Sequence, residues 1–252
     1  MHIEVSHLAK SAGRTIMKYY QNKEIDVQTK LDQSPVSEAD IAAHQIIVKG
    51  LRELNSRIPV VSEEDFPASG EFNFSQGQVW LVDPLDGTKD FLKGTGDFTV
   101  NIALLEDGKP MAGVVYAPFT DELFTAWDGV VQKNFEVLSP SPSSNRIAGV
   151  SHFHKSSDLD KFLMHNRFTE TETIGSSLKF CRLIEGAIDI YPRLGPTSQW
   201  DIAAGHALVN AMKGYSISDY HGNELSYGKP PILNPWFVAH REGLEWTRID
   251  CS

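Results

Sequence analysis

The sequence has only two cysteines in 252 residues, Cys181 and Cys251. One lies within an apolar helical pattern and the other lies next to the C-terminus, so we expect neither a disulfide framework nor a cysteine metal site. A reducing cytoplasm fits this content. The sequence also lacks any run of about 18 apolar residues, which gives no candidate transmembrane segment. Its start, MHIEVSHLAK, lacks the basic residues and apolar stretch of a secretory signal.

Positive charge is scarce as well. The chain has 23 Lys and Arg residues against 33 Asp and Glu residues, which gives a net charge of −10. This balance argues against a nucleic-acid polymer as the main partner, because phosphate contacts along a polymer need a basic face. It is compatible with a small phosphorylated ligand, because a bound divalent cation draws phosphate into a cluster of carboxylates.

Hydrophobic periodicity predicts two helices and then a series of strands in the first part of the chain. Apolar residues recur at helical spacing over 3–20, and Ser37 is expected to cap a second helix that ends near Leu54. Asp107-Gly108 predicts the turn of a β-hairpin. The expected strands are IPVV before SEED, VWLVD, the two arms of TVNIALLEDGKPMAGVVYAP, LFTAW and VVQKNFEVL, with an exposed loop over 66–78.

The segment LSPSPSSNR, at 138–146, is rich in serine and proline and predicts a boundary between two subdomains. We expect an N-terminal α+β subdomain over 1–143 and a C-terminal α/β subdomain over 144–252. Beyond the boundary, the order of elements is typical of an α/β sheet. The expected elements are the strand IAGVSHF, the helices LDKFLMHN and SSLKFCRLIEG, the strand AIDIYPRL and the helix WDIAAGHALVNAMKG.

Residues 80–91, WLVDPLDGTKDF, join a buried strand to two carboxylates. Asp83 ends the apolar run, and Asp86 follows three residues later, just before Gly87 and Thr88. A plain turn is one interpretation, because Asp-Pro and Asp-Gly both form turns. The alternative is a ligand site, in which the intervening proline turns the chain and both carboxylates face one point. The N–H groups of Gly87 and Thr88 would then start a helix and bind an anion.

Further acids stand at the ends of predicted strands and the starts of predicted helices. Glu63 begins the acidic run that follows IPVVS, Asp40 lies in the first turn of one helix, and Asp201 begins another. Taken singly, Glu63 could be solvated loop charge, and the other two could be members of helix-capping boxes. Capping does not explain acid-rich endings on two buried strands. Clustered carboxylates suit Mg²⁺, and two such ions could clamp the attacking and leaving oxygens of a phosphoryl transfer.

These motifs resemble those of the inositol monophosphatase superfamily of Mg²⁺-dependent, lithium-sensitive phosphatases. Within it, the chain most resembles the 3′(2′),5′-bisphosphate nucleotidases of sulfate assimilation. The most specific features are D-P-L-D-G-T after an acid pair and the later W-D-x-A-A-G. The resemblance implies a fold of mixed α+β and α/β character, a layered αβαβα sandwich of the inositol monophosphatase and fructose-bisphosphatase type. The matching segments are SPVSEADIAAH, VVSEED, WLVDPLDGTKDF, FTVNIAL, GKPMAGVVYAP, IGSSLKF and WDIAAGHA.

The resemblance also implies a metal centre between the two subdomains, with two or three Mg²⁺ ions. Glu63, Asp83 and the Leu85 carbonyl resemble the ligands of one metal. Asp83, Asp86 and Asp201 resemble the ligands of a second. The five acids are therefore expected to act as one centre, with Asp40 as the fifth.

Catalytic and substrate-binding roles follow from the same resemblance. Asp40 and Thr88 match the pair that orients and activates the attacking water. Ser176 and Lys179 match a nucleotidase S-x-x-K motif, although Ser176 could instead cap its helix and Lys179 could lie on a solvated face. The residues expected to contact substrate are Glu63, Leu85, Asp86, Gly87, Thr88, His154, Ser176, Lys179, Arg193 and Asp201.

The sequence thus predicts a Mg²⁺-dependent phosphatase that removes the 3′-phosphate of adenosine 3′,5′-bisphosphate with a metal-activated water, giving AMP. An inositol monophosphatase or a broad sugar phosphatase is the alternative enzyme, because the same metal centre would serve it. A cation- or nucleotide-binding regulatory protein is the non-enzyme alternative, but it predicts the loss of a metal acid or of Thr88, and none is lost. The resemblance implies a cytoplasmic location, with some bacterial relatives at the inner face of the cell membrane.

Overall fold

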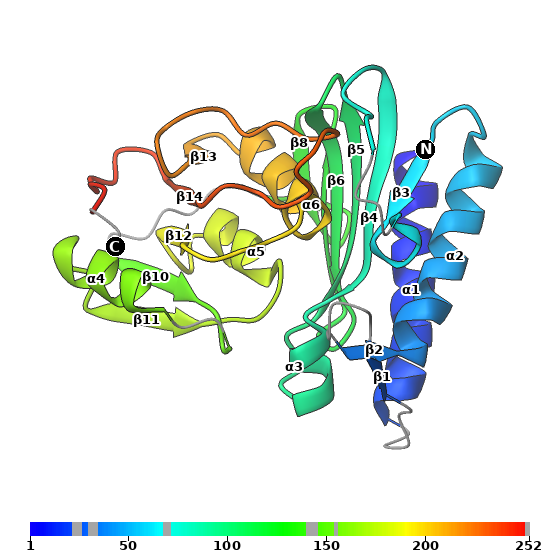
Figure 1. Ribbon diagram of the computed structural model, residues 1–252, viewed down its shortest axis with the longest axis horizontal. Coiled ribbons are helices and arrows are strands. Elements are labelled where there is room, and N and C mark those ends of the chain that lie inside the picture. Colours follow the sequence, from blue (N-terminus) through cyan, green and yellow to red (C-terminus); the bar gives the residue numbers. More distant parts are fainter. Residues whose placement is uncertain (22–26, 30–34, 68–71, 140–145, 154–155, 250–252) are drawn as a thin grey trace.

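The computed structural model of the protein describes residues 1–21, 27–29, 35–67, 72–139, 146–153 and 156–249. Two large β-sheets alternate with three layers of helix (Figure 1). The helices α1 (His2–Gln21) and α2 (Glu38–Leu54) cover the outer face of the larger sheet, and α5 (Leu178–Glu185) and α6 (Gln199–Ala211) lie between the sheets. On the far side, α4 (Ser157–His165) packs against the smaller sheet. The expected αβαβα sandwich is therefore confirmed.

Alternating side chains along the central strands explain this layering. In the larger sheet, Trp80 and Val82 pack toward the outer helices, whereas Val79 and Leu81 pack toward α5 and α6. Successive strand residues point to opposite faces, so a strand that is apolar throughout can serve two cores at once. This is why VWLV reads as a continuous apolar run rather than as an alternating one.

The larger sheet has seven strands, of which β3 and β4 are parallel and the other neighbours are antiparallel. In spatial order its strands are β3 (Val60–Ser62), β4 (Gln78–Asp86), β5 (Thr99–Glu106), β6 (Lys109–Ala117), β7 (Glu122–Trp127), β8 (Val130–Lys133) and β9 (Glu136–Val137). The predicted turn at Asp107-Gly108 is confirmed, because it joins β5 to β6. The segment VVQKNFEVL is not one strand but two, because Asn134 and Phe135 turn with positive φ.

The smaller sheet has five strands and mixes parallel with antiparallel pairs. In spatial order its strands are β11 (Glu170–Thr173), β10 (Ile147–Val150), β12 (Ile190–Arg193), β14 (Phe237–Arg241) and β13 (Tyr215–Asp219). The predicted subdomain boundary at 143 and 144 lies outside the described residues and stays a prediction. The larger sheet draws its strands from 60–137 and the smaller one from 147–241.

A short two-stranded sheet, β1 (Val27–Thr29) with β2 (Pro35–Ser37), precedes α2. The predicted helices over 3–20 and up to Leu54 are confirmed by α1 and α2. The remaining short elements are η1 (Glu63–Asp65), a single 3₁₀ turn, and α3 (Thr88–Lys93). No helix within the described residues is long and apolar enough to cross a membrane.

Candidate active site

The sheet register brings two predicted acids together. Because β3 runs parallel to β4 with Ser62 opposite Val82, the next residues along the chain lie side by side, Glu63 just after the end of β3 and Asp83 within β4. Glu63 opens the η1 turn, and Asp83 is 1% exposed. The predicted acidic endings on neighbouring strands therefore meet at one point.

The strand β4 does not end at Asp83, as the sequence analysis expected, but continues to Asp86. Its register against β5 shifts between these two residues, so the proline between them produces a β-bulge rather than a turn. Within the bulge, the Leu85 N–H donates to Asp83 Oδ1 at 3.1 Å. The Leu85 carbonyl accepts the Thr88 hydroxyl at 3.3 Å. The bulge thus presents two carboxylates and one carbonyl on a short stretch of chain.

Asp86 lies among hydrogen-bond donors from both halves of the molecule. Its Oδ2 accepts the Ser177 N–H at 2.7 Å and the Asn101 Nδ2 at 3.3 Å. Burial raises the pKa of Asp86, while the charge of Lys179 and the hydrogen bonds from Ser177 and Asn101 act to lower it. The donors favour the ionised carboxylate against the cost of desolvation.

Asp201 lies in the first turn of α6, where the predicted capping box is confirmed. The Ser198 N–H donates to Asp201 Oδ2 at 2.8 Å, and the Ser198 side chain caps the helix in return. The hydrogen bond of the helix cap uses Asp201 Oδ2. A carboxylate oxygen of Asp201 also lies within 4.8 Å of carboxylate oxygens of Glu63 and Asp83. Capping and membership of the acidic cluster are therefore compatible.

The acids of this cluster are close enough to perturb one another. Burial raises the pKa of Asp83 well above its ordinary value, and the charges of Glu63, Asp86, Asp201 and Asp40 raise it further. Burial raises the pKa of Asp201 in the same direction, with Asp86 and Glu63 adding to it. Carboxylates held this way favour protonation or a bound cation, and a set of oxygen donors matches the preference of Mg²⁺. The cluster therefore fits a divalent cation.

The two predicted catalytic residues approach this cluster from different elements. Asp40 is 1% exposed in the first turn of α2, and its charge reaches Asp83. Thr88 is the first residue of α3, after Gly87, whose φ of 88° suits a glycine. Thr88 and Gly87 line the cleft beside the acids. The pairing of Asp40 with Thr88 stays a prediction.

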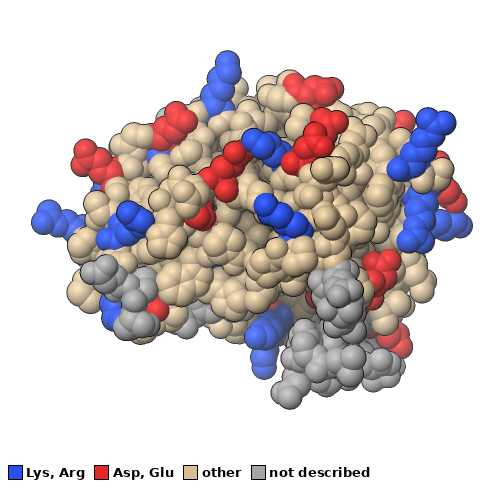
Figure 2. All heavy atoms as spheres, turned by 45° about the horizontal axis from the view of Figure 1, so that its top comes forward, with Lys and Arg blue, Asp and Glu red and all other residues tan. Residues whose placement is uncertain are grey.

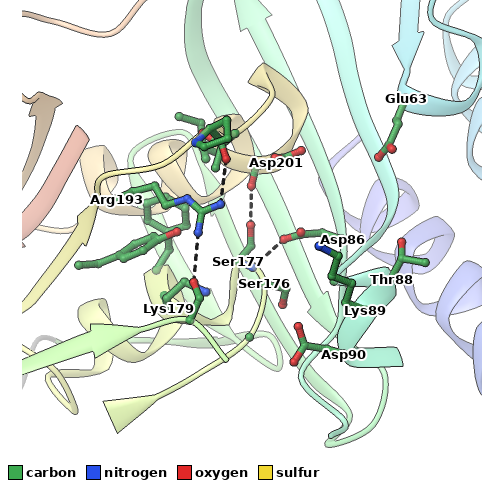
Figure 3. Close-up of a pocket in the computed structure, with 18 residues that line it drawn as sticks. Glu63, Asp86, Thr88, Lys89, Asp90, Ser176, Ser177, Lys179, Arg193 and Asp201 are labelled. Carbon is green, nitrogen blue, oxygen red and sulfur yellow. Dashed lines mark hydrogen bonds between the residues drawn. The ribbon is translucent and has the colours of Figure 1, made fainter. Parts of the chain in front are cut away.

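A cleft of about 220 Å³ opens between the two sheets, lined by Asp86 and Lys89 from the first half of the chain and by Lys179 and Arg193 from the second. Figure 3 shows Asp86, Lys89 and Thr88 on one side of it and Lys179 and Arg193 on the other. Among the lining residues are Glu63, Asp86, Gly87, Thr88, Ser176, Lys179, Arg193 and Asp201. The predicted His154 lies outside the described residues.

Lys179 and Arg193 are buried, so the alternative of a solvated Lys179 is wrong. Lys179 is 2% exposed, lies over the Tyr191 ring and donates to the Ile174 carbonyl at 2.9 Å. Burial lowers its pKa to about 8, although Asp86 opposes the shift. Arg193 donates to Ser151 and to the Pro196 carbonyl.

Ser176 does not cap α5, because the N-cap position belongs to Ser177. Ser176 has a φ of 44°, which is uncommon for a residue with a side chain. Its buried Oγ lacks a hydrogen-bond partner and lies in the wall of the cleft. That oxygen is available to a ligand.

Several residues of the site were not predicted. Asn101 and Ser177 connect Asp86 with the Asp201 carbonyl, which accepts the Ser177 hydroxyl at 2.6 Å. Asn101 lies in the quoted segment FTVNIAL, where a buried polar residue within an apolar strand could have drawn attention. A second group, Asp90, Asp97 and His152, places its ligand atoms within 4.8 Å of one another beside the cleft. Those three residues are too far apart in the sequence for a motif to show.

Comparisons with known proteins agree with this geometry. The Inositol monophosphatase family matches residues 3–245. The 3′(2′),5′-bisphosphate nucleotidase CysQ of Escherichia coli K12 is 45% identical over 243 residues, covering 93% of this chain and 97% of that protein. The CysQ protein of Buchnera aphidicola is 40% identical, covering 94% and 92%. The crystal structure of CysQ from Bacteroides thetaiotaomicron is 32% identical with a TM-score of 0.80, covering 96% of this chain and 97% of that one.

Proposed function

Because the chain belongs to the inositol monophosphatase family, we propose that it is a 3′(2′),5′-bisphosphate nucleotidase. It hydrolyses the 3′-phosphate of adenosine 3′,5′-bisphosphate and releases AMP and phosphate. The observation that carries the proposal is a cleft with an acidic cluster on one side and two buried cations, Lys179 and Arg193, on the other. A substrate with two phosphates matches that division. The relatives named CysQ support the same substrate class.

The acidic side would hold two or three Mg²⁺ ions. Glu63, Asp83 and the Leu85 carbonyl would hold one, and Asp83, Asp86 and Asp201 would hold another. The donor set supports this assignment, because all of it is oxygen and most of it is carboxylate. Bound Mg²⁺ would supply the positive charge that draws the 3′-phosphate in and polarises it. The residues around the centre then have to orient a water and the leaving group.

Asp40 and Thr88 would orient that water. The Thr88 hydroxyl lies 3.3 Å from the Leu85 carbonyl, at the edge of the bulge that carries the acids. The buried Asp40 carboxylate is the base that would accept the water's proton, directly or through Thr88. The N–H groups of Gly87 and Thr88 would hold the phosphate undergoing attack.

The basic side would hold the 5′-phosphate. Lys179 and Arg193 supply the charge, and the Ser176 hydroxyl supplies a donor from the cleft wall. A phosphate outside the metal centre needs such partners, because the chain as a whole carries a charge of −10. His154 would add a nucleotide contact. An inositol monophosphate has no second phosphate, so the basic side favours a bisphosphate.

A nucleic-acid polymer is not the proposed partner. Figure 2 shows basic and acidic side chains interspersed over one face, whereas a polymer needs a continuous basic surface. The proposed partner is a small nucleotide bisphosphate. The cytoplasmic location, with or without contact to the inner membrane face, stays a prediction.

A panel of phosphate esters tests the proposed function. Purified protein in Mg²⁺ would receive adenosine 3′,5′-bisphosphate, inositol 1-phosphate and fructose 1,6-bisphosphate at equal concentrations, with phosphate release measured and the organic product identified. We expect the highest kcat/KM for the adenosine bisphosphate, with AMP as the product that keeps its 5′-phosphate. A preference for inositol 1-phosphate, or adenosine 3′-phosphate as product, would reject the nucleotidase assignment.

A further inference from the structure

The loop over 174–177 connects both sides of the cleft. Its Ser177 N–H donates to Asp86 Oδ2 at 2.7 Å, and the Ser177 hydroxyl donates to the Asp201 carbonyl at 2.6 Å. Its Ile174 carbonyl accepts from Lys179. A displacement of this loop would therefore disturb Asp86, Lys179 and the Ser176 hydroxyl together.

The loop holds an unfavourable conformation. Ser176 has a φ of 44°, in a region that residues with a side chain seldom occupy. Such a residue keeps its conformation only when its surroundings fix it. The surroundings of this loop must therefore supply an anchor.

Asp97, in the first half of the chain, anchors this loop. Its Oδ2 accepts the Gly175 N–H at 2.9 Å and His152 Nε2 at 2.7 Å. The packing is tight, because a Cβ on Gly175 would lie 2.5 Å from the Asp97 carbonyl oxygen and 2.8 Å from Asp90 Cγ. One carboxylate oxygen thus joins the segment before β5 to two segments of the second half.

Asp97 is itself held in place by its neighbours. Its N–H donates to Thr95 Oγ1 at 3.3 Å, and that hydroxyl donates to Asp90 Oδ1 at 2.9 Å. His152 lies 3.9 Å from the same Asp90 oxygen. The carboxylate of Asp97 therefore has a fixed direction, which a positioning residue requires.

We propose that Asp97, supported by His152, is a positioning residue for the reaction, and that it acts through the Gly175 peptide on Ser176 and on Asp86. Asp97 and His152 form a group with Asp90 that is separate from the cluster of Glu63, Asp83 and Asp201. The inference rests on the proposed hydrolysis, because its effect is a change in the rate of that reaction. The geometry of the anchor can be measured separately, without any turnover.

Asp107 offers a matched control at the opposite end of β5. It also accepts a glycine N–H, with Gly77 N at 2.8 Å from Asp107 Oδ1. It follows Glu106, the last residue of the strand, whereas Asp97 precedes Thr99, the first. Asp107→Ala removes the same kind of hydrogen bond far from the cleft.

The experiment compares Asp97→Ala, Asp97→Asn, His152→Ala and Asp107→Ala, using the best substrate of the panel above. We expect Asp97→Ala to lower kcat/KM by at least roughly tenfold, because small displacements of positioned groups are costly. His152→Ala should have a smaller effect in the same direction. Asp97→Asn should recover most of the rate, because an amide oxygen can still accept both hydrogen bonds. Asp107→Ala should keep the wild-type kcat/KM.

Hydrogen exchange separates this inference from the proposed function. In Asp97→Ala, we expect faster amide exchange in the peptide that covers 174–177, with exchange in the central strands unchanged. This readout needs no substrate, so it holds even if the adenosine bisphosphate proves to be the wrong ester. Unchanged exchange in that loop, or a loss of kcat/KM no larger than that of Asp107→Ala, would overturn the inference.

Discussion

Two groups of charged side chains are partly or fully buried in this protein, and they are built in opposite ways. Between β7, β8 and α5, two acids and two bases alternate. Lys133 and Arg182 both pair with Glu122, and both also pair with Glu185. At the head of the cleft, by contrast, Glu63, Asp83 and Asp201 bring like charges within 4.8 Å of one another.

The two groups differ in the direction of their pKa shifts. In the first, burial acts to raise the pKa of Glu122, but hydrogen bonds from Arg182 and Lys133 outweigh it and lower the pKa to about 2. In the second, burial and neighbouring acids together raise the pKa of Asp83. A balanced network stabilises the fold as it stands, whereas an unbalanced one favours binding of a cation. The difference separates a structural cluster from a functional one.

Removing one acid from the unbalanced cluster should have the largest effect on rate. Asp83→Asn takes away the charge that both proposed metal positions share. If those ions supply several kcal/mol, at about 1.4 kcal/mol per decade, kcat should fall by roughly a thousandfold or more. Steady-state phosphate release in saturating Mg²⁺ measures this, with Glu122→Gln as the control that keeps its rate. An Asp83→Asn protein with most of its activity would contradict the metal assignment.

The catalytic pair should give the next largest effect. If Asp40 only serves the start of α2, Asp40→Asn should leave the rate nearly unchanged, because Asn also caps helices well. If it takes up the proton of the water oriented by Thr88, Asp40→Asn and Thr88→Val should each lower kcat by about a hundredfold or more. The double variant should be no worse than the single ones. If the free-energy losses of the two single variants add up in the double variant, the two residues act independently.

The basic side of the cleft should affect binding more than turnover. Lys179→Met keeps the packing over Tyr191 but removes the charge, so KM for adenosine 3′,5′-bisphosphate should rise by roughly tenfold with little change in kcat. Hydrolysis of inositol 1-phosphate should be nearly unaffected, because that ester has no second phosphate. Arg193→Ala should behave alike, and Lys133→Ala serves as the control. Equal losses on both esters would argue against a 5′-phosphate position.

The pH dependence of KM tests the role of the Lys179 charge further. Burial lowers the pKa of Lys179 to about 8, so the free enzyme loses this charge as the pH rises through that value. KM for the adenosine bisphosphate should therefore rise above about pH 8 in the wild type. In Lys179→Met the corresponding rise should disappear, while a rise of equal size in both proteins would assign the titration to another group.

The balanced network should show its effect in stability rather than in rate. With its pKa lowered to about 2, Glu122 stabilises the fold fully above its unfolded pKa near 4.5, and this contribution is lost as the pH falls toward 2. Glu122→Gln should cost about 1–2 kcal/mol at pH 7, because solvent screens part of this half-buried network, and progressively less below pH 4.5. Urea unfolding in chelator measures this. In metal-free protein, Asp83→Asn should instead raise the free energy of unfolding at pH 7. Because the pKa of Asp83 is raised in the folded state, ionised Asp83 destabilises the fold more as the pH rises.

The family resemblance predicted the layers, and sequence patterns predicted the clustered acids, but neither predicted the contacts that join the two halves. Periodicity gave the helices α1 and α2, because their buried residues recur at helical spacing. The bulge between Asp83 and Asp86 was not predicted, because a proline within a strand and a proline in a turn look alike in sequence. The Asp97, His152 and Gly175 junction was missed because its members are brought together only by the fold.

Mg²⁺ binding to metal-free protein, followed by isothermal titration calorimetry, tests the central claim without relying on turnover. The comparison uses the wild type, Asp83→Asn and Glu122→Gln under one set of conditions. We expect saturable Mg²⁺ binding by the wild type and Glu122→Gln, and a large loss of affinity in Asp83→Asn. Equal Mg²⁺ binding by the wild type and Asp83→Asn would contradict the claim that the acids at the head of the cleft form the metal centre.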